Sequence, residues 1–87
     1  MAAIPKAECP HIANVHPEPA VVSTACAECG AAGPTRVCLT CSHVGCCESS
    51  NGHATAHARA RDHPIIRSLP LSSSSFTWCY ECNAYLT

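Results

Sequence analysis

The chain alternates between apolar and polar residues over short segments that predict strands. Residues 34–39 (PTRVCL) alternate and predict one strand. Two segments rich in β-branched or aromatic residues, 64–69 (PIIRSL) and 76–80 (FTWCY), predict two more. Residues 84–86 predict a last short strand, and residues 20–23 predict a short strand near the N-terminus.

One segment has helical character instead. Residues 52–62 hold alanine at every second position from 54 to 60, which favours a helix of roughly ten residues, and Pro64 ends it. Residues 49–51 (SSN) offer side-chain oxygens that can cap the first turn. His53 and His57 are four residues apart, so the two side chains share one face of this helix.

The segments between these elements are predicted to be loops. Residues 12–25 contain two prolines and no helical period, and we expect His16 in this loop to be solvated. Four serines, residues 72–75, separate two predicted strands and are expected to form a hairpin loop. Apolar runs such as residues 20–22 are far too short to cross a bilayer.

Length and cysteine content indicate how a chain of this size is stabilised. A chain of 87 residues forms one domain, 1–87, with too small a core to be stable without cross-links. Nine cysteines allow disulfides or metal, but the count is odd. Residues 1–8 lack the basic and apolar regions of a signal peptide, so we expect a cytoplasmic protein. In a reducing compartment, cysteines interleaved with histidines favour metal over a disulfide scaffold.

Charge restricts the class of partner. The formal net charge is -1 with only five Lys and Arg residues, whereas a protein that follows nucleic-acid phosphates needs a concentrated basic face. We therefore expect the partner to be a protein or peptide, and neither nucleic acid nor membrane. We also expect the protein to be a monomer.

The cysteines occur largely as CxxC pairs, at residues 26–29, 38–41 and 79–82. Gly30 follows the first pair, as in a zinc knuckle whose tight turn often needs a positive φ. A single CxxC is equally typical of a thioredoxin-like redox pair. That interpretation requires a βαβ pattern, and the sequence shows no such pattern.

The other candidate ligands are Cys-x-His at residues 9–11, one further cysteine and three further histidines. A structural zinc ion takes four Cys or His ligands, so twelve candidates make three complete sites. His43 and Cys47 fall outside this set and are expected next to ligands, although Cys47 could replace Cys46. The twelve are Cys9, His11, Cys26, Cys29, Cys38, Cys41, Cys46, His53, His57, His63, Cys79 and Cys82.

Spacing alone leaves two groupings open. In a sequential scheme, the CxxC pairs at 26–29 and 38–41 share one ion, and Cys46 joins the three later histidines on the next. In a cross-braced scheme, pair 26–29 joins Cys46 and His53, and pair 38–41 joins His57 and His63. Both schemes close residues 9 and 11 with 79 and 82, which ties the two ends of the chain together.

The order CxH, CxxC, CxxC, Cys, three His and CxxC, with NGH at 51–53 and WCYEC at 78–82, resembles the three-zinc form of the UBP-type zinc finger. That module occurs in ubiquitin-specific proteases and a histone deacetylase, and the match covers the metal-binding core, residues 9–86. The resemblance implies an α+β fold, a twisted antiparallel sheet packed with one main helix. It also implies the cross-braced grouping and three zinc ions as the cofactor.

The resemblance further implies a pocket for the free C-terminal Gly-Gly tail of ubiquitin. Trp78, Tyr80 and Tyr85 match the pocket aromatics, whereas Glu48 and Ser49 stand where the family has arginine and an aromatic residue. Losing the arginine's charge-assisted hydrogen bond weakens binding by roughly ten- to a hundredfold. The three matching aromatics could instead fill the core around the metal.

Three classes of function remain on these grounds. The first is a zinc module with a pocket for a protein or peptide C-terminus, and the second is an interaction domain without such a pocket. The third is an enzyme, but a hydrolytic zinc site keeps one position open for water, and twelve ligands fill three ions. We therefore expect a non-catalytic protein.

Overall fold

The computed structural model describes residues 2–15, 21 and 23–87. His16 and residues 20 and 22 of the strand expected at 20–23 lie outside the described residues, so these two expectations stay predictions. Within the described ranges, no helix is long and apolar enough to cross a membrane.

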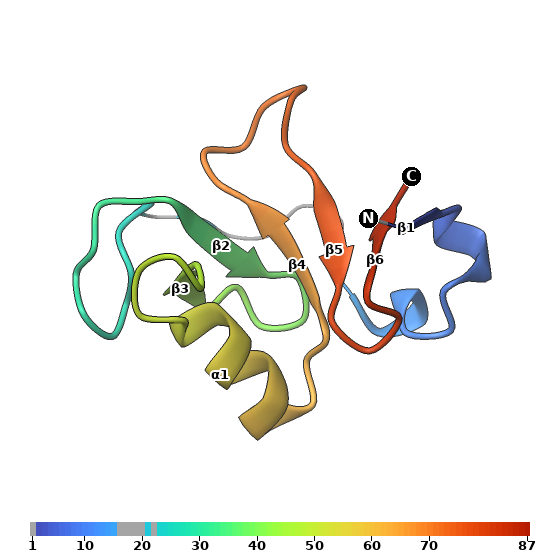
Figure 1. Ribbon diagram of the computed structural model, residues 1–87, viewed down its shortest axis with the longest axis horizontal. Coiled ribbons are helices and arrows are strands. Elements are labelled where there is room, and N and C mark those ends of the chain that lie inside the picture. The colour runs from blue at the N-terminus through green and yellow to red at the C-terminus, as the bar shows by residue number, and fades with distance from the viewer. Residues whose placement is uncertain (1, 16–20, 22) are drawn as a thin grey trace.

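A six-stranded mixed sheet and one helix make up the fold (Figure 1). The sheet has the order β1-β6-β5-β4-β2-β3, and every neighbouring pair is antiparallel except β1 and β6. Two single-turn 3-10 helices, η1 (Lys6–Glu8) and η2 (Ile12–Asn14), follow the first strand, and α1 spans His53–Arg61. The strands are β1 (Ala2–Ile4), β2 (Thr35–Cys38), β3 (Val44–Cys46), β4 (Ile65–Ser68), β5 (Thr77–Cys79) and β6 (Ala84–Leu86).

Four of these strands lie where the sequence predicts them, whereas β1 and β3 were not predicted. β1 corrects the expected all-antiparallel sheet, because it pairs in parallel with β6. Two backbone hydrogen bonds extend this pairing: Lys6 N–H donates to Thr87 O (3.3 Å) and Thr87 N–H donates to Ile4 O (2.9 Å). The two ends of the chain therefore lie side by side at one edge of the sheet (Figure 1).

The helix agrees with the expected range, but its cap does not. The N-cap residue is Gly52 in a left-handed conformation (φ 66°), with no side-chain hydrogen bond, so the serines and asparagine at 49–51 do not cap it. Asp62 ends the helix in a second left-handed residue, and its N–H donates to Ala58 O. The serine tract forms the expected hairpin loop between β4 and β5.

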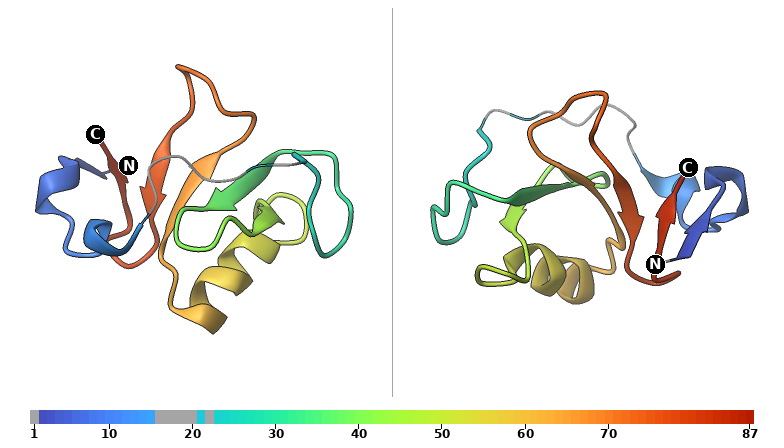
Figure 2. Two further views of the ribbon diagram at one scale, coloured as in Figure 1. Left: turned by 180° about the vertical axis from the view of Figure 1, so that it is seen from behind. Right: turned by 45° about the horizontal axis from the view of Figure 1, so that its top comes forward.

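One face of the sheet carries the hydrophobic core. Its buried residues include Val37, Ile65 and Leu86, and the N-terminal residues Ile12 and Val15 pack against them. Figure 2 shows α1 against the β2–β3 end, and the N-terminal segment beside β6 at the other end.

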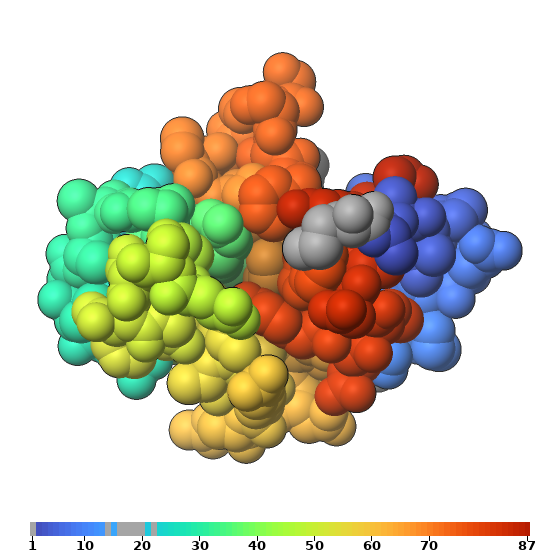
Figure 3. Space-filling model, viewed as in Figure 1, coloured from blue at the N-terminus to red at the C-terminus, as the bar shows by residue number. Residues whose placement is uncertain are grey.

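Gly45 on β3 allows the helix to lie directly on the sheet. A Cβ atom at this position would be 2.5 Å from the backbone nitrogen of Ala54 in α1. The helix covers only part of its face of the sheet, and the space-filling view shows that the surface over β4 is recessed between the segments on either side (Figure 3).

Candidate metal centres and an adjoining pocket

The first Cys/His cluster joins the two ends of the chain. Cys9 and His11 meet Cys79 and Cys82, and the four donor atoms lie within 4.8 Å of one another. Nδ1 of His11 is 3.6 Å from Sγ of Cys9, 3.4 Å from that of Cys79 and 3.6 Å from that of Cys82. The Sγ atoms of Cys9 and Cys82 are 3.7 Å apart.

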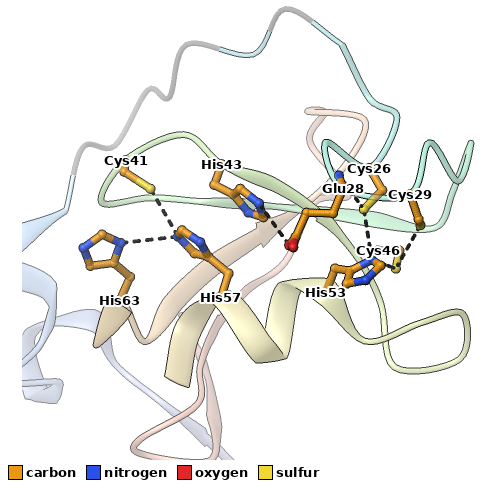
Figure 4. Close-up of polar contacts among 9 residues, drawn as sticks. All are labelled: Cys26, Glu28, Cys29, Cys41, His43, Cys46, His53, His57 and His63. Atoms are coloured by element: carbon orange, nitrogen blue, oxygen red, sulfur yellow. Dashed lines mark hydrogen bonds and ion pairs between the residues drawn. The ribbon is translucent and has the colours of Figure 1, made fainter. Parts of the chain in front are cut away.

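The second cluster gathers Cys26, Cys29, Cys46 and His53 (Figure 4). Nδ1 of His53 is 3.4 Å from Sγ of both Cys26 and Cys46. Cys29 and Cys46 have their Sγ atoms 3.9 Å apart. Cys46 ends β3 and His53 begins α1, so the contact of the helix with the sheet brings these ligands together.

The third cluster consists of Cys38, Cys41, His57 and His63. Nε2 of His57 is 3.2 Å from Sγ of Cys41 and 3.4 Å from Nδ1 of His63 (Figure 4). His57 lies one turn further along α1 than His53, so the two helical histidines serve different clusters. The structure therefore brings the twelve predicted ligands together in the cross-braced grouping, and the sequential grouping is wrong.

The spacing of the donor atoms fits tetrahedral zinc. With Zn–S near 2.3 Å and Zn–N near 2.0–2.1 Å, a tetrahedron has edges of about 3.8 Å for S–S, 3.6 Å for S–N and 3.4 Å for N–N. The distances above, 3.7 and 3.9 Å, 3.2–3.6 Å and 3.4 Å, match these three edges. When bound, zinc would cross-link the segments that carry its ligands, and each ion would have four protein donors.

The three CxxC turns share one backbone feature. The residue after each second cysteine has a positive φ: Gly30 (75°), Ser42 (68°) and Asn83 (52°). This turn directs backbone N–H groups at the sulfur atoms, with Glu28 N–H 3.4 Å from Sγ of Cys26 and Cys82 N–H 3.4 Å from Sγ of Cys79. The positive φ expected at Gly30 is confirmed.

The two Cys₃His clusters differ in acidity. Burial raises the pKa of the Cys26 thiol, but backbone N–H groups from Cys29, Glu28 and Cys46 outweigh burial and lower this pKa to about 6. Burial and the neighbouring thiols of Cys9 and Cys79 raise the pKa of Cys82 to about 12. The pKa of Cys46 is lowered as well, whereas in the first cluster the pKa of Cys9 is lowered and that of Cys79 is raised by burial, so more of the resolved thiols favour the thiolate that metal requires in the second cluster.

Asn51 and Glu28 support the clusters without belonging to them. Asn51 donates to two ligand sulfurs, through Nδ2 to Cys29 (3.4 Å) and through its backbone N–H to Cys46 (3.3 Å). Glu28 lies in the first CxxC turn, and its Oε2 is 3.3 Å from Nε2 of His43. The position of Asn51, directly before Gly52 and His53, is the only hint of this role in the sequence.

The two residues left outside the ligand set lie beside it, as expected. His43 stacks on His57 (Figure 4). Cys47 follows Cys46 but points elsewhere, with its Sγ 2.7 Å from Oγ of Ser49. Cys46 rather than Cys47 belongs to the second cluster.

A pocket of about 680 Å³ lies on the α1 side of the sheet. It brings together the five residues that the family resemblance implied, and the arginines Arg36 and Arg59 also line it. The five are Glu48, Ser49, Trp78, Tyr80 and Tyr85.

The aromatic side chains line this pocket as a connected group. Tyr85 makes edge-to-face contacts with Trp78 (centroids 4.9 Å apart) and Phe76 (5.2 Å). Trp78 is 9% exposed, whereas Tyr80 and Tyr85 are half-buried. Cys79 lies on the opposite face of β5 from Trp78 and packs in the core. The aromatics thus form the wall of a groove.

Three closed clusters of Cys and His on a small sheet with one helix define a zinc-stabilised domain. Comparison with known families identifies which one. The family model described as "Zn-finger in ubiquitin-hydrolases and other protein" matches residues 26–87, and the chain belongs to this UBP-type zinc finger family. The match contains the second and third clusters and the Cys79–Cys82 half of the first.

Individual relatives extend the similarity to the N-terminal ligands. The chain is 36% identical to histone deacetylase 6 of Caenorhabditis elegans over 98% of its own length, and 33% identical to mouse ubiquitin carboxyl-terminal hydrolase 3 over 92%. It spans only 9% and 18% of these two proteins. The solution structure of protein RPA1320 from Rhodopseudomonas palustris is similar at 34% identity and a TM-score of 0.72, covering 90% of this chain and 79% of that one.

Proposed function

We propose that this protein is a non-catalytic, cytoplasmic binding module that takes the free C-terminal tail of another protein into the pocket beside Trp78. A ubiquitin-like tail that ends in Gly-Gly is the ligand class we favour. The observation that carries the proposal is the pocket itself, which unites the aromatic wall with two arginines.

Size and shape support a peptide ligand. Small-molecule and peptide pockets commonly measure 300–1,000 Å³ and combine apolar walls with a few polar groups. The pocket of about 680 Å³ lies in this range, and the contact of Tyr85 with Trp78 gives it a rigid aromatic wall. A glycine tail has no side chains to clash with such a wall.

Glu48 favours a second candidate, an interaction domain that has lost tail binding. Its carboxylate lines the pocket and would repel a terminal carboxylate. Thr55 Oγ1 donates to Oε1 of Glu48 (3.0 Å), which holds this acid on the helix side of the pocket. The two candidates differ in one measurable property, affinity for a free C-terminus.

The test is a titration of the zinc-loaded protein with a short peptide ending in Gly-Gly with a free carboxylate, followed by two-dimensional NMR. We expect shifts concentrated on Trp78 and its pocket neighbours. Tyr85→Ala should abolish them, whereas Leu71→Ala, on the exposed β4–β5 loop, should not. Absence of any shift at millimolar peptide would reject tail binding and favour the interaction domain.

A further inference from the structure

Arg36 reaches the pocket because of the register of the sheet. Arg36 on β2 pairs with Ser68 on β4, and two residues earlier on β4, Ile66 pairs with Trp78 on β5. Cross-strand partners point to the same face of a sheet, and so do residues two apart on one strand. Arg36 and Trp78 therefore lie on one face, which places the arginine among the residues that line the pocket.

Two contacts hold the guanidinium in place. Nη1 of Arg36 donates to the carbonyl oxygen of Thr35 (3.0 Å), and Cζ lies 4.8 Å from the centroid of the Phe76 ring. The cation thus rests on the aromatic wall of the pocket. A guanidinium has five N–H donors, so most remain available to a ligand.

The guanidinium of Arg36 has no ion-pair partner among the residues that the structure describes. Within the described part of the chain, Arg36 forms no ion pair with any carboxylate, the recorded pair being Glu28 with His43. Two acids line the pocket, Glu48 and Glu81, and Glu48 accepts a hydrogen bond from Thr55 on α1. Glu48 is therefore held on the helix side of the pocket, and the Arg36 cation on the sheet side has no ion-pair partner among the described residues.

We propose that Arg36 is the residue that binds the terminal carboxylate of the tail and so determines specificity for a free C-terminus. This inference rests on the proposed function. A planar guanidinium can bind a carboxylate through two parallel hydrogen bonds, and the half-buried position of Arg36 strengthens them relative to an exposed charge. Arg59 lines the same pocket but lies at an exposed position of α1, and among the described residues its guanidinium forms no hydrogen bond or ion pair.

The test compares two forms of one Gly-Gly peptide, the free acid and the C-terminal amide. For the unaltered zinc-loaded protein, we expect the acid to bind about ten- to a hundredfold more tightly than the amide. Arg36→Gln should bind acid and amide equally, and Arg36→Lys should recover part of the preference. Arg61→Gln, at an exposed position of the same helix that does not line this pocket, is the matched control and should keep the full preference.

The outcomes separate the two proposals. If the unaltered protein binds neither peptide, the proposed function fails and this inference fails with it. If it binds the acid and Arg36→Gln still prefers acid to amide, tail binding stands and the role of Arg36 is overturned. Equal binding of acid and amide by the unaltered protein also overturns that role. NMR dispersion of each variant shows that a lost preference does not come from unfolding.

Discussion

His43 lies flat against His57, with ring centroids 4.0 Å apart and planes inclined by only 4°. His57 belongs to the third cluster, and the other side of His43 contacts Glu28 in the turn of the second. This histidine therefore bridges two metal clusters without belonging to either.

Replacing His43 by alanine should destabilise the zinc-loaded domain. Stacked aromatic pairs contribute about 0.5–1.5 kcal/mol beyond their burial, and a loss of about 1 kcal/mol lowers Tm by about 4–8 °C in a domain of this size. Calorimetry of the zinc-loaded variant measures the fall in Tm. His43→Phe retains a stacked ring and should recover most of the loss, and an unchanged Tm for His43→Ala would contradict the bridge.

Removing zinc should unfold the domain. The free energy of binding a structural zinc ion is largely folding free energy, and a chain of 87 residues has a small core of its own. Excess chelator should collapse the amide NMR dispersion, and zinc should restore it with a stoichiometry of three. Chelator already saturated with zinc is the control. Retained dispersion after complete metal removal would show that the hydrophobic core keeps the domain folded without zinc, which would contradict the prediction.

Acid should release zinc from the first cluster before the second. Zinc binds thiolates, so the unfolded state carries more protons than the zinc-loaded state, and stability rises with pH and falls as pH is lowered. The clusters have the same donor set. In the first, the pKa values of Cys79 and Cys82 are raised and only that of Cys9 is lowered, whereas in the second those of Cys26 and Cys46 are both lowered, so protons compete better at the first.

The rings of His11 and His53 report the two clusters separately. In an NMR titration from pH 8 downward, we expect the His11 signals to change to the metal-free form at the higher pH. Simultaneous release from both clusters, or release first from that of His53, would contradict the difference in acidity.

Gly45→Ala should disrupt the contact of α1 with the sheet. The added Cβ would lie 2.5 Å from the backbone nitrogen of Ala54, and backbone cannot move aside as a flexible side chain can. Overpacking of this kind costs typically about 1–3 kcal/mol, so Tm should fall clearly. Gly30→Ala is the matched control, because a Cβ there meets nothing within 4 Å and only the positive φ is strained. The prediction fails if Gly45→Ala is no less stable than this control.

Glu48→Gln should increase the affinity for a free C-terminal tail. Glutamine keeps an oxygen that can accept from Thr55 but removes the negative charge from the pocket. Relief of about 1 kcal/mol of repulsion corresponds to about fivefold in Kd. High salt should reduce the gain, because ions screen exposed charges. An equal gain for the amidated peptide would show that charge is not the cause.

The sequence predicts the metal ligands better than their grouping. The twelve candidates follow from residue type and count, but either grouping satisfies the spacing of His53 and His57 on one helical face. The contact of α1 with β3 decides between them, by placing His53 beside Cys46 and His57 beside Cys41. Packing of distant segments is not visible in local spacing.

The missed elements have a similar explanation. β1 and β3 have three residues each, too few to show alternation, and β1 gains its hydrogen bonds only from β6 at the other end of the chain. The place of Arg36 in the pocket depends on the register of β2 against β4, which no local pattern reveals. The four predicted strands carry a stronger local signal, because β2 and β4 have four residues each and β5 and β6 contain the aromatic residues Trp78 and Tyr85.

The cross-braced grouping makes two closed loops of chain overlap. Ligands of the second cluster run from Cys26 to His53, and those of the third from Cys38 to His63, so each loop encloses part of the other. When zinc leaves one cluster, the chain segment shared with the other loop becomes flexible. The flexible part of the remaining loop is then longer, so the entropy cost of closing that loop is higher. Occupancy of these two clusters is therefore linked through the chain, because an ion bound at one cluster lowers the entropy cost of closing the loop of the other.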